Sequence, residues 1–292
     1  MVLTNCGLPI ADCGLVLSHF QTSPLLKARD QGSSSTGTSI DLGRTTIQAM
    51  IRTDGISLPD STFIPWHVIE EIDGCKNACF SIRDGSPIAI RGFSESLGRA
   101  CSLMPTTSAP VMVIAGFPMH RFKNITPINA ALAMVEPLAP LMGNVLDTAT
   151  GLGYTAIEAA KKASHVTTIE LCPVAQEMAR MNPWSQGLFD NPLISRIIGD
   201  STEEIGTFAD ENFSAIIHDP PTVSLAGDLY SGDFYKQAHR VLQPRGKLFH
   251  YLGDPESASG SRVTKGVVRR LYDAGFKKVT PAPKAFGVVA YK

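Results

Sequence analysis

The pattern of hydrophobic and polar positions divides the chain into two parts. From residue 144 onward, short apolar segments alternate with segments of helical length. This alternation predicts a mostly parallel sheet with helices on both faces. The expected strands are 144–149, 165–171, 194–200, 213–219, 246–252, 277–283 and 286–292. The expected helices are 154–163, 173–181, 201–208, 230–242 and 262–274.

The last two expected strands are joined by a very short connection, Pro283 to Ala285. A crossover helix does not fit into so few residues, so these strands are expected to form an antiparallel hairpin. The fold class predicted for residues 106–292 is therefore α/β, with a doubly wound, mostly parallel seven-stranded sheet and a C-terminal antiparallel hairpin. A strand at 111–114 and a helix at 127–140 are expected to lead into this sheet.

Residues 1–105 follow a β pattern. Short β-prone segments at 45–52, 62–66, 78–83 and 86–93 are punctuated by Asp-Gly pairs that begin at residues 54, 73 and 84, and such pairs are typical of β-hairpins. Residues 65–72 are interpreted as one or two helical turns, and the Gly/Ser/Thr-rich run 31–39 as a flexible connection. We expect a smaller, mostly β accessory domain that acts as a lid, a homodimerisation module or a substrate-recognition module.

Composition narrows the class of protein. Hydrophobic residues at 43% and charged residues at 18% predict a globular chain with a sizeable core. The net charge of -1 favours a small molecule or a protein over RNA as the partner, with RNA left open. The long apolar stretch 128–146 is interrupted by charged and proline residues, so no membrane span is expected. The six cysteines form no CxxC pair, which favours free thiols in a cytoplasmic protein without a metal site.

The motif that organises the larger part is Asp147-Thr-Ala-Thr-Gly-Leu-Gly-Tyr154, between the first expected strand and helix. Gly151 and Gly153 let the backbone approach a ligand, and Glu170 ends the next strand, where an acid suits ribose hydroxyls. Both NAD and S-adenosylmethionine fit this pattern. Asp147 favours S-adenosylmethionine, because an acid suits its cationic amino group and is unfavourable beside a pyrophosphate. The residues expected to bind this cofactor are Asp147, Thr148, Gly151, Gly153, Tyr154, Glu170, Leu171, Asp200, Ser201 and Asp219.

A second motif, His218-Asp-Pro-Pro-Thr222, follows the fourth expected strand, next to the first βα turn. It resembles the D/N-P-P-Y/F motif of amino-group methyltransferases. That resemblance implies that Asp219 and Pro220 orient an attacking amine. Thr222 stands where an aromatic residue would stack on a flipped base, which argues against a nucleobase acceptor. His218 and His250 are candidates for the general base.

The acceptor pocket is expected to involve Arg121, Thr222, Tyr230 and Tyr251. Arg121 in particular could clamp an anionic substrate or the carboxylate of the cofactor. Together with the first motif and the hairpin, these features resemble the class I S-adenosylmethionine-dependent methyltransferases. The order of motifs over about residues 105–280 resembles a family of predicted, largely archaeal methyltransferases with an HDPP sequence.

Three functional hypotheses follow. The leading one is methyl transfer from S-adenosylmethionine to an amino nitrogen, on an acceptor that the sequence does not identify. An aminopropyl transferase of the same fold is the second, and a non-catalytic subunit that binds the cofactor for a partner is the third. The Asp-Pro-Pro loop argues against the third, because an inactive subunit has no use for that geometry.

Overall fold

The computed structural model describes residues 14–254 and 256–292. Its largest element is a seven-stranded sheet with strand order β14-β13-β12-β15-β16-β18-β17. The first five strands in this order are parallel, and β18 is antiparallel to both β16 and β17. The strands are β12 (Asn144–Asp147), β13 (His165–Glu170), β14 (Ile194–Ile198), β15 (Phe213–His218), β16 (Leu242–Tyr251), β17 (Lys278–Ala282) and β18 (Gly287–Tyr291). The α/β class with a mostly parallel seven-stranded sheet and a C-terminal hairpin is thus confirmed.

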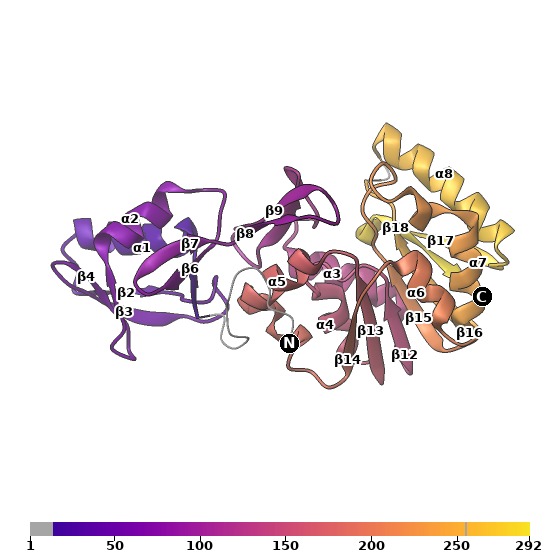
Figure 1. Cartoon of the computed structure of the whole chain (residues 1–292), viewed down its shortest axis with the longest axis horizontal. Helices are drawn as coiled ribbons and strands as arrows, with labels where there is room; N and C mark the ends of the chain where they lie inside the picture. The colour runs from indigo at the N-terminus through magenta and orange to yellow at the C-terminus, as the bar shows by residue number, and fades with distance from the viewer. Residues whose placement is uncertain (1–13, 255) are drawn as a thin grey trace.

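Helices cover both faces of this sheet because neighbouring strand residues point to opposite sides. On β12, Val145 packs in one core with α3, α4 and α5, while Leu146 packs in a second core with α6, α7 and α8. Figure 1 shows the two helical layers. The helices are α3 (Pro127–Val135), α4 (Tyr154–Ala160), α5 (Pro173–Met181), α6 (Ser201–Thr207), α7 (Gly232–Val241) and α8 (Ala258–Asp273). Short 3-10 turns are η1 (Glu136–Leu138), η2 (Pro183–Leu188), η3 (Gly227–Tyr230) and η4 (Pro283–Ala285).

The N-terminal part contains two small antiparallel sheets and two helices around a third core. One sheet has the order β1-β6-β7, and the other β2-β3-β4-β5. The strands are β1 (Leu15–Leu17), β2 (Ser35–Thr38), β3 (Ile47–Ile51), β4 (Gly55–Ser57), β5 (Phe63–Pro65), β6 (Phe80–Arg83) and β7 (Ser86–Ala89). The helices are α1 (His19–Asp30) and α2 (Trp66–Gly74).

Three local expectations for this part are corrected. The run 31–39 is not a flexible connection, because β2 lies within it and pairs with β3. The Asp73-Gly74 pair ends α2 and does not form a hairpin turn, whereas Asp84-Gly85 does connect paired strands. Helix α1 was not expected; it begins at a capping box formed by Ser18 and Gln21.

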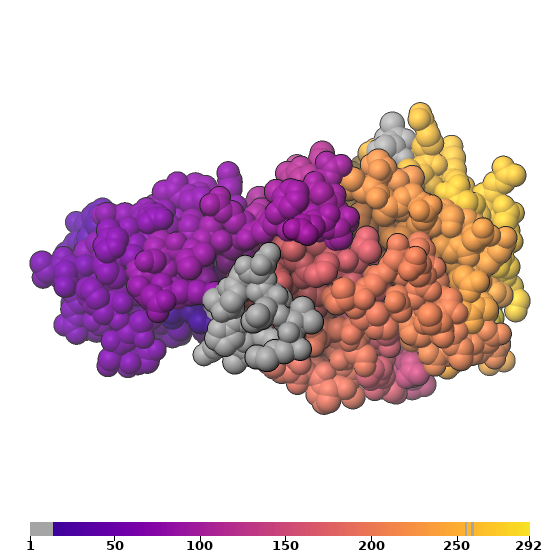
Figure 2. All heavy atoms as spheres, in the orientation of Figure 1, coloured from indigo at the N-terminus to yellow at the C-terminus, as the bar shows by residue number. Residues whose placement is uncertain are grey.

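A third small sheet, which we call the arm sheet (residues 91–118), joins the two parts. It contains β8 (Arg91–Ser94), β9 (Arg99–Met104), β10 (Val111–Ile114) and β11 (Phe117–Pro118). The Cys79 N–H, which directly precedes β6 of the N-terminal part, donates a hydrogen bond to the Leu103 carbonyl of β9 (3.0 Å). On the other side, Gly92 of β8 packs against Val174 of α5. Figure 2 shows the arm sheet between the N-terminal part and the part that contains the seven-stranded sheet. The expected boundary at residue 105 falls between the paired strands β9 and β10.

Candidate functional site

The glycine turn between β12 and α4 requires two left-handed backbone conformations. Gly151 has φ +53° and Gly153 has φ +78°. A Cβ atom on Gly153 would lie 2.7 Å from Leu188, so a side chain is excluded there by space as well as by backbone conformation. The turn therefore carries no side chain at these two positions, at the carboxyl end of the sheet.

Asp147, at the end of β12, is completely buried beneath this turn. Its Oδ2 accepts hydrogen bonds from the hydroxyls of Thr155 (3.1 Å) and Thr168 (2.9 Å). Its Oδ1 has no partner among the residues that the structure describes. Burial raises the pKa of Asp147 to about 7, although the two hydroxyls act in the opposite direction. A buried carboxylate oxygen without a partner is costly, so Oδ1 is suited to a cationic ligand group.

Glu170, at the end of β13, lies across the turn. Its Oε2 accepts from the Gly151 N–H (2.8 Å) and its Oε1 from the Cys172 N–H (2.9 Å). Burial raises the pKa of Glu170, and the two backbone donors oppose that effect. The next residue, Leu171, is an exposed apolar side chain with 48% of its surface accessible. An acid beside an exposed apolar residue is an arrangement that suits a ribose and an adjoining base.

Other expected cofactor residues make hydrogen bonds within the protein. Asp200 caps α6 by accepting from the N–H of Thr202 (2.8 Å), and the Ser201 hydroxyl donates to the Thr148 carbonyl (2.7 Å). Tyr154 is buried, and its hydroxyl donates to the Pro110 carbonyl (2.8 Å), which ties α4 to the arm sheet. For Thr148 and Tyr154 the expectation of direct cofactor contact is therefore corrected, because both side chains point into the protein.

Asp219 follows β15 and lies close to the end of β12. It is half-buried, and burial together with the nearby charge of Asp147 raises its pKa to about 7, while Arg121 opposes the rise. Tyr230 and Tyr251 lie near enough to feel its charge: burial first, and Asp219 second, raise the pKa of both phenols. The expected acceptor residues Arg121, Tyr230 and Tyr251 are thus all within electrostatic range of Asp219.

The Asp-Pro-Pro loop (residues 219–222) is held by the segment that follows it. The Tyr230 hydroxyl donates to the Pro221 carbonyl (3.0 Å), and Pro220 is buried. Thr222 is exposed, with its hydroxyl 3.1 Å from that of Ser224. The buried Tyr230 therefore holds the loop from the protein interior, while Thr222 lies at the surface.

The two histidines are not placed as general bases. Both are completely buried. The Leu229 carbonyl can only accept, so the His218 Nε2–H donates to it (2.9 Å), and His218 Nδ1 accepts from the Thr148 hydroxyl (2.6 Å). His250 Nε2 is 2.9 Å from the Tyr235 hydroxyl. Burial lowers the pKa of both rings, that of His218 to about 4, so they are neutral core groups packed against α7.

Tyr251 shows why alternation along β16 matters. Its neighbour His250 points into the core with α7, so Tyr251 points to the other face, towards Asp219. Tyr251, expected in the acceptor pocket, is therefore on the side of the sheet where the charge of Asp219 acts on it. For His250, the expected role as general base is corrected, because its ring is buried in the core.

His120 was not among the expected site residues. A Cβ atom on Gly151 would lie 3.5 Å from His120 Nε2, so this ring covers the glycine turn from the arm sheet. Its Nδ1 accepts from the Met112 N–H at 3.4 Å, and burial lowers its pKa to about 4. In the sequence, the only indication that His120 belongs to the site is its position directly before Arg121, which was an expected site residue.

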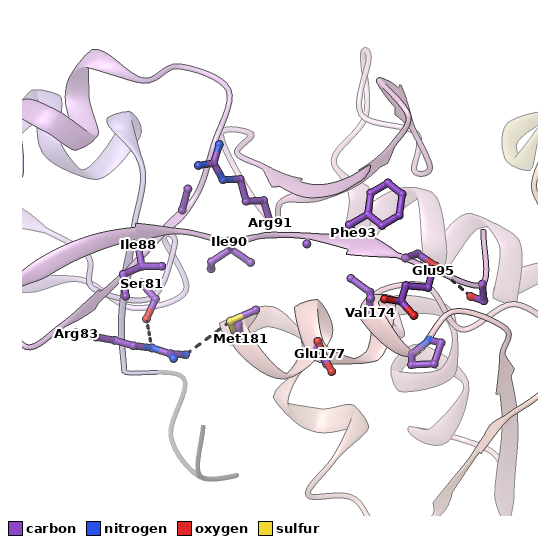
Figure 3. A pocket seen from close by; sticks show the side chains of 15 residues that line it. Ser81, Arg83, Ile88, Ile90, Arg91, Phe93, Glu95, Val174, Glu177 and Met181 are labelled. Atoms are coloured by element: carbon purple, nitrogen blue, oxygen red, sulfur yellow. Dashed lines mark hydrogen bonds between the residues drawn. The ribbon is translucent and has the colours of Figure 1, made fainter. Parts of the chain in front are cut away.

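A cavity of about 570 Å³ lies elsewhere, between β7, β8 and α5. In Figure 3, Val174, Glu177 and Met181 of α5 lie on one side of β8, while Arg91 and Phe93 lie on the other side of that strand. None of the site residues described above lines it. Among residues 14–254 and 256–292, no group of three His, Cys, Asp or Glu could hold a metal ion, and no helix is long and apolar enough to cross a membrane.

This fold, with a glycine turn after the first strand and acids at the ends of the next strands, is that of class I S-adenosylmethionine-dependent transferases. Residues 129–252 match the family model of the methyltransferase small domain. The uncharacterized protein MJ1233 of Methanocaldococcus jannaschii is 46% identical over 235 residues, which cover 78% of each chain. The chain belongs to the same family as MJ1233.

More distant similarities were found in sequence and in structure. A polyamine aminopropyltransferase of Sulfurisphaera tokodaii is 28% identical over 158 residues, 51% of each chain. The spermidine synthase of Thermotoga maritima has a TM-score of 0.55 at 20% identity, covering 69% of this chain and 70% of that one. MnmC2 of Aquifex aeolicus has a TM-score of 0.50 at 19% identity, covering 65% and 70%. At these identities, the structural similarities show the fold alone.

Proposed function

We propose that this protein transfers a methyl group from S-adenosylmethionine to an amino nitrogen. The observation that carries the proposal is the position of Asp219, a half-buried carboxyl next to the end of β12, in the Asp-Pro-Pro loop. A carboxylate there can accept a hydrogen bond or a proton from an amine and hold its lone pair in one direction.

The residues present fit an adenosyl cofactor. Glu170 and the exposed Leu171 would hold the ribose and the base, and the free Oδ1 of Asp147 would accept from the cationic amino group. When bound, S-adenosylmethionine supplies an electrophilic methyl group on a sulfonium. Asp219 takes up the proton that an ammonium acceptor must lose, and Tyr230 keeps its loop in place.

Aminopropyl transfer is the second candidate, favoured by the match to a polyamine aminopropyltransferase over 51% of the chain. It would use the same carboxylate and the same glycine turn. Arg121 argues against it, because a cation beside Asp219 opposes the binding of a polyamine. Methyl transfer is therefore placed first.

The test is to incubate the full chain with labelled S-adenosylmethionine, or with its decarboxylated form, and a metabolite extract of the source cells. S-adenosylhomocysteine as coproduct supports methyl transfer, and methylthioadenosine supports aminopropyl transfer. Cofactor binding without either coproduct would favour the non-catalytic hypothesis.

Substitution Asp219→Asn tests the assigned residue. We expect kcat to fall by about 100-fold or more, a typical loss for an acid–base group. At saturating cofactor, so that ionisation of Asp147 does not limit binding, wild-type kcat should rise with pH through about 7, where Asp219 ionises, and this rise should be absent in the variant. Asp233→Asn, at an exposed position of α7, is the matched control and should keep wild-type activity. Equal activity of both variants would contradict the assignment.

A further inference from the structure

Arg121 is fixed at the acceptor end of the site from two sides. Its Nη1 donates to the Lys284 carbonyl (2.9 Å), and its Cζ lies 3.5 Å from the centre of the Phe286 ring. Lys284 and Phe286 both belong to the connection between β17 and β18. Within residues 14–254 and 256–292, Arg121 forms no ion pair with a carboxylate.

The register of the sheet puts this connection level with Asp219. His218 pairs with His250 on β16, and Tyr251 pairs with Gly287 on β18. Asp219, which follows His218, is therefore in a row with Tyr251 of β16 and Gly287 of β18, and Phe286 directly precedes Gly287. Adjacent strands are about 4.8 Å apart, so Asp219 and the Phe286 backbone are roughly 10 Å apart along this row. Arg121, held at one end of this row by Lys284 and Phe286, acts electrostatically on both Asp219 and Tyr251.

The site thus holds a carboxyl group and a guanidinium within electrostatic range of each other, without an ion pair between them in the described residues. The guanidinium face rests on Phe286, which limits its motion, while one of its nitrogens is used by the Lys284 carbonyl. The remaining N–H groups can bind a carboxylate or a phosphate with two parallel hydrogen bonds. A polyamine has cations at both ends and would leave this arginine without a partner.

We propose that the acceptor is a small amine that also carries an acidic group, either a carboxylate or a phosphate. Arg121 binds the acidic group and Asp219 holds the nitrogen. Arg121 is then the residue that selects the acceptor. This proposal rests on the transfer function proposed above and adds the class of substrate.

The first experiment characterises the labelled product formed by the full chain from S-adenosylmethionine and the small-molecule extract. The product is expected to pass through a cation exchanger at pH 7, because its acidic group offsets the charge of its amine, whereas an amine without an acid is retained. Phosphatase restores retention if the acid is a phosphate, and esterification restores it if the acid is a carboxylate. A labelled product without an acidic group, or label found only in RNA or protein, overturns the proposal. Absence of any coproduct overturns the transfer function itself, so the two failures are distinguishable.

The second experiment compares Arg121→Gln, Arg121→Lys and the control Arg180→Gln. Arg180 also stacks on an aromatic ring, that of Phe189, but on α5, away from the acceptor end. We expect Arg121→Gln to raise the acceptor KM by about 10- to 100-fold, the worth of a charge-assisted contact, with the cofactor KM unchanged. Arg121→Lys should recover part of this loss, and Arg180→Gln should show none. If Arg121→Gln instead lowers thermal stability and changes both KM values equally, the arginine is only a structural clamp.

Discussion

The burial of the Asp147 carboxyl predicts how the free energy of unfolding changes with pH, and this prediction does not depend on any substrate. Its side chain has no accessible surface, and one of its oxygens lacks a partner among the described residues. The substitution Asp147→Asn keeps the shape and removes the charge. Its amide oxygen can still accept from the Thr155 and Thr168 hydroxyls. We therefore expect the variant to fold and to be more stable than the wild type at pH 8.

The magnitude follows from the pKa. Burial raises the pKa of Asp147 from 3.8 to about 7. A carboxyl with a raised pKa in the folded chain stabilises the fold fully below 3.8, and this stability is lost as the pH rises through about 7. The whole difference corresponds to about 4 kcal/mol, of which about 3 kcal/mol falls between pH 5 and pH 8.

The assay is urea unfolding of the cofactor-free protein at pH 5, 6, 7 and 8. The free energy of unfolding of Asp147→Asn, minus that of the wild type, should increase by about 3 kcal/mol over this range. Asp228→Asn, at an exposed site, is the control and should run parallel to the wild type. Parallel curves for Asp147→Asn as well would refute the argument, because they would show that Asp147 is ionised without cost. The same variant should lose cofactor affinity.

Two further predictions concern the supports of the site. Gly153→Ala should lower the free energy of unfolding by about 2 kcal/mol or more, since its Cβ would lie 2.7 Å from Leu188 at φ +78°; thermal unfolding followed by circular dichroism measures this, and an unchanged midpoint contradicts it. His218→Gln should destabilise the fold, by about 1–3 kcal/mol for the lost buried hydrogen bonds. It should leave the pH dependence of kcat unchanged, and loss of a titrating step would restore His218 as general base.

The sheet could be predicted because its signals are local. Apolar strands, helix-length connections and the short link at Pro283–Ala285 determine a parallel sheet with a final hairpin. The N-terminal part was predicted less well, because its pairing partners are distant in the sequence. Ser35–Thr38 has the composition of a linker and becomes a strand only through its pairing with Ile47–Ile51. Helix α1 was missed because Pro24 lies within it and argues against a helix, although the capping box of Ser18 and Gln21 indicates one.

The site divides in the same way. The acids at the ends of β12, β13 and β15 were predictable, because parallel strands end at one edge of the sheet. The burial of His250 was not, since strand alternation places His250 and Tyr251 on opposite faces without saying which face packs against α7. In the sequence, a histidine directly before the Asp-Pro-Pro loop suggests proton transfer. In the structure, the His218 ring instead stacks on Phe234 of α7 and is part of the core.

The two halves of the site also carry different information about function. The glycine turn, Glu170 and Asp219 all lie within residues 129–252, which match the methyltransferase small domain. Such residues serve any transferase that uses an adenosyl sulfonium, so they cannot distinguish methyl from aminopropyl transfer. Arg121 and Phe286 lie outside that range, on the segments before and after it. If Arg121 selects the acceptor as proposed, part of that choice lies in segments that the shared domain does not include, and Arg121 is where experiments on specificity should begin.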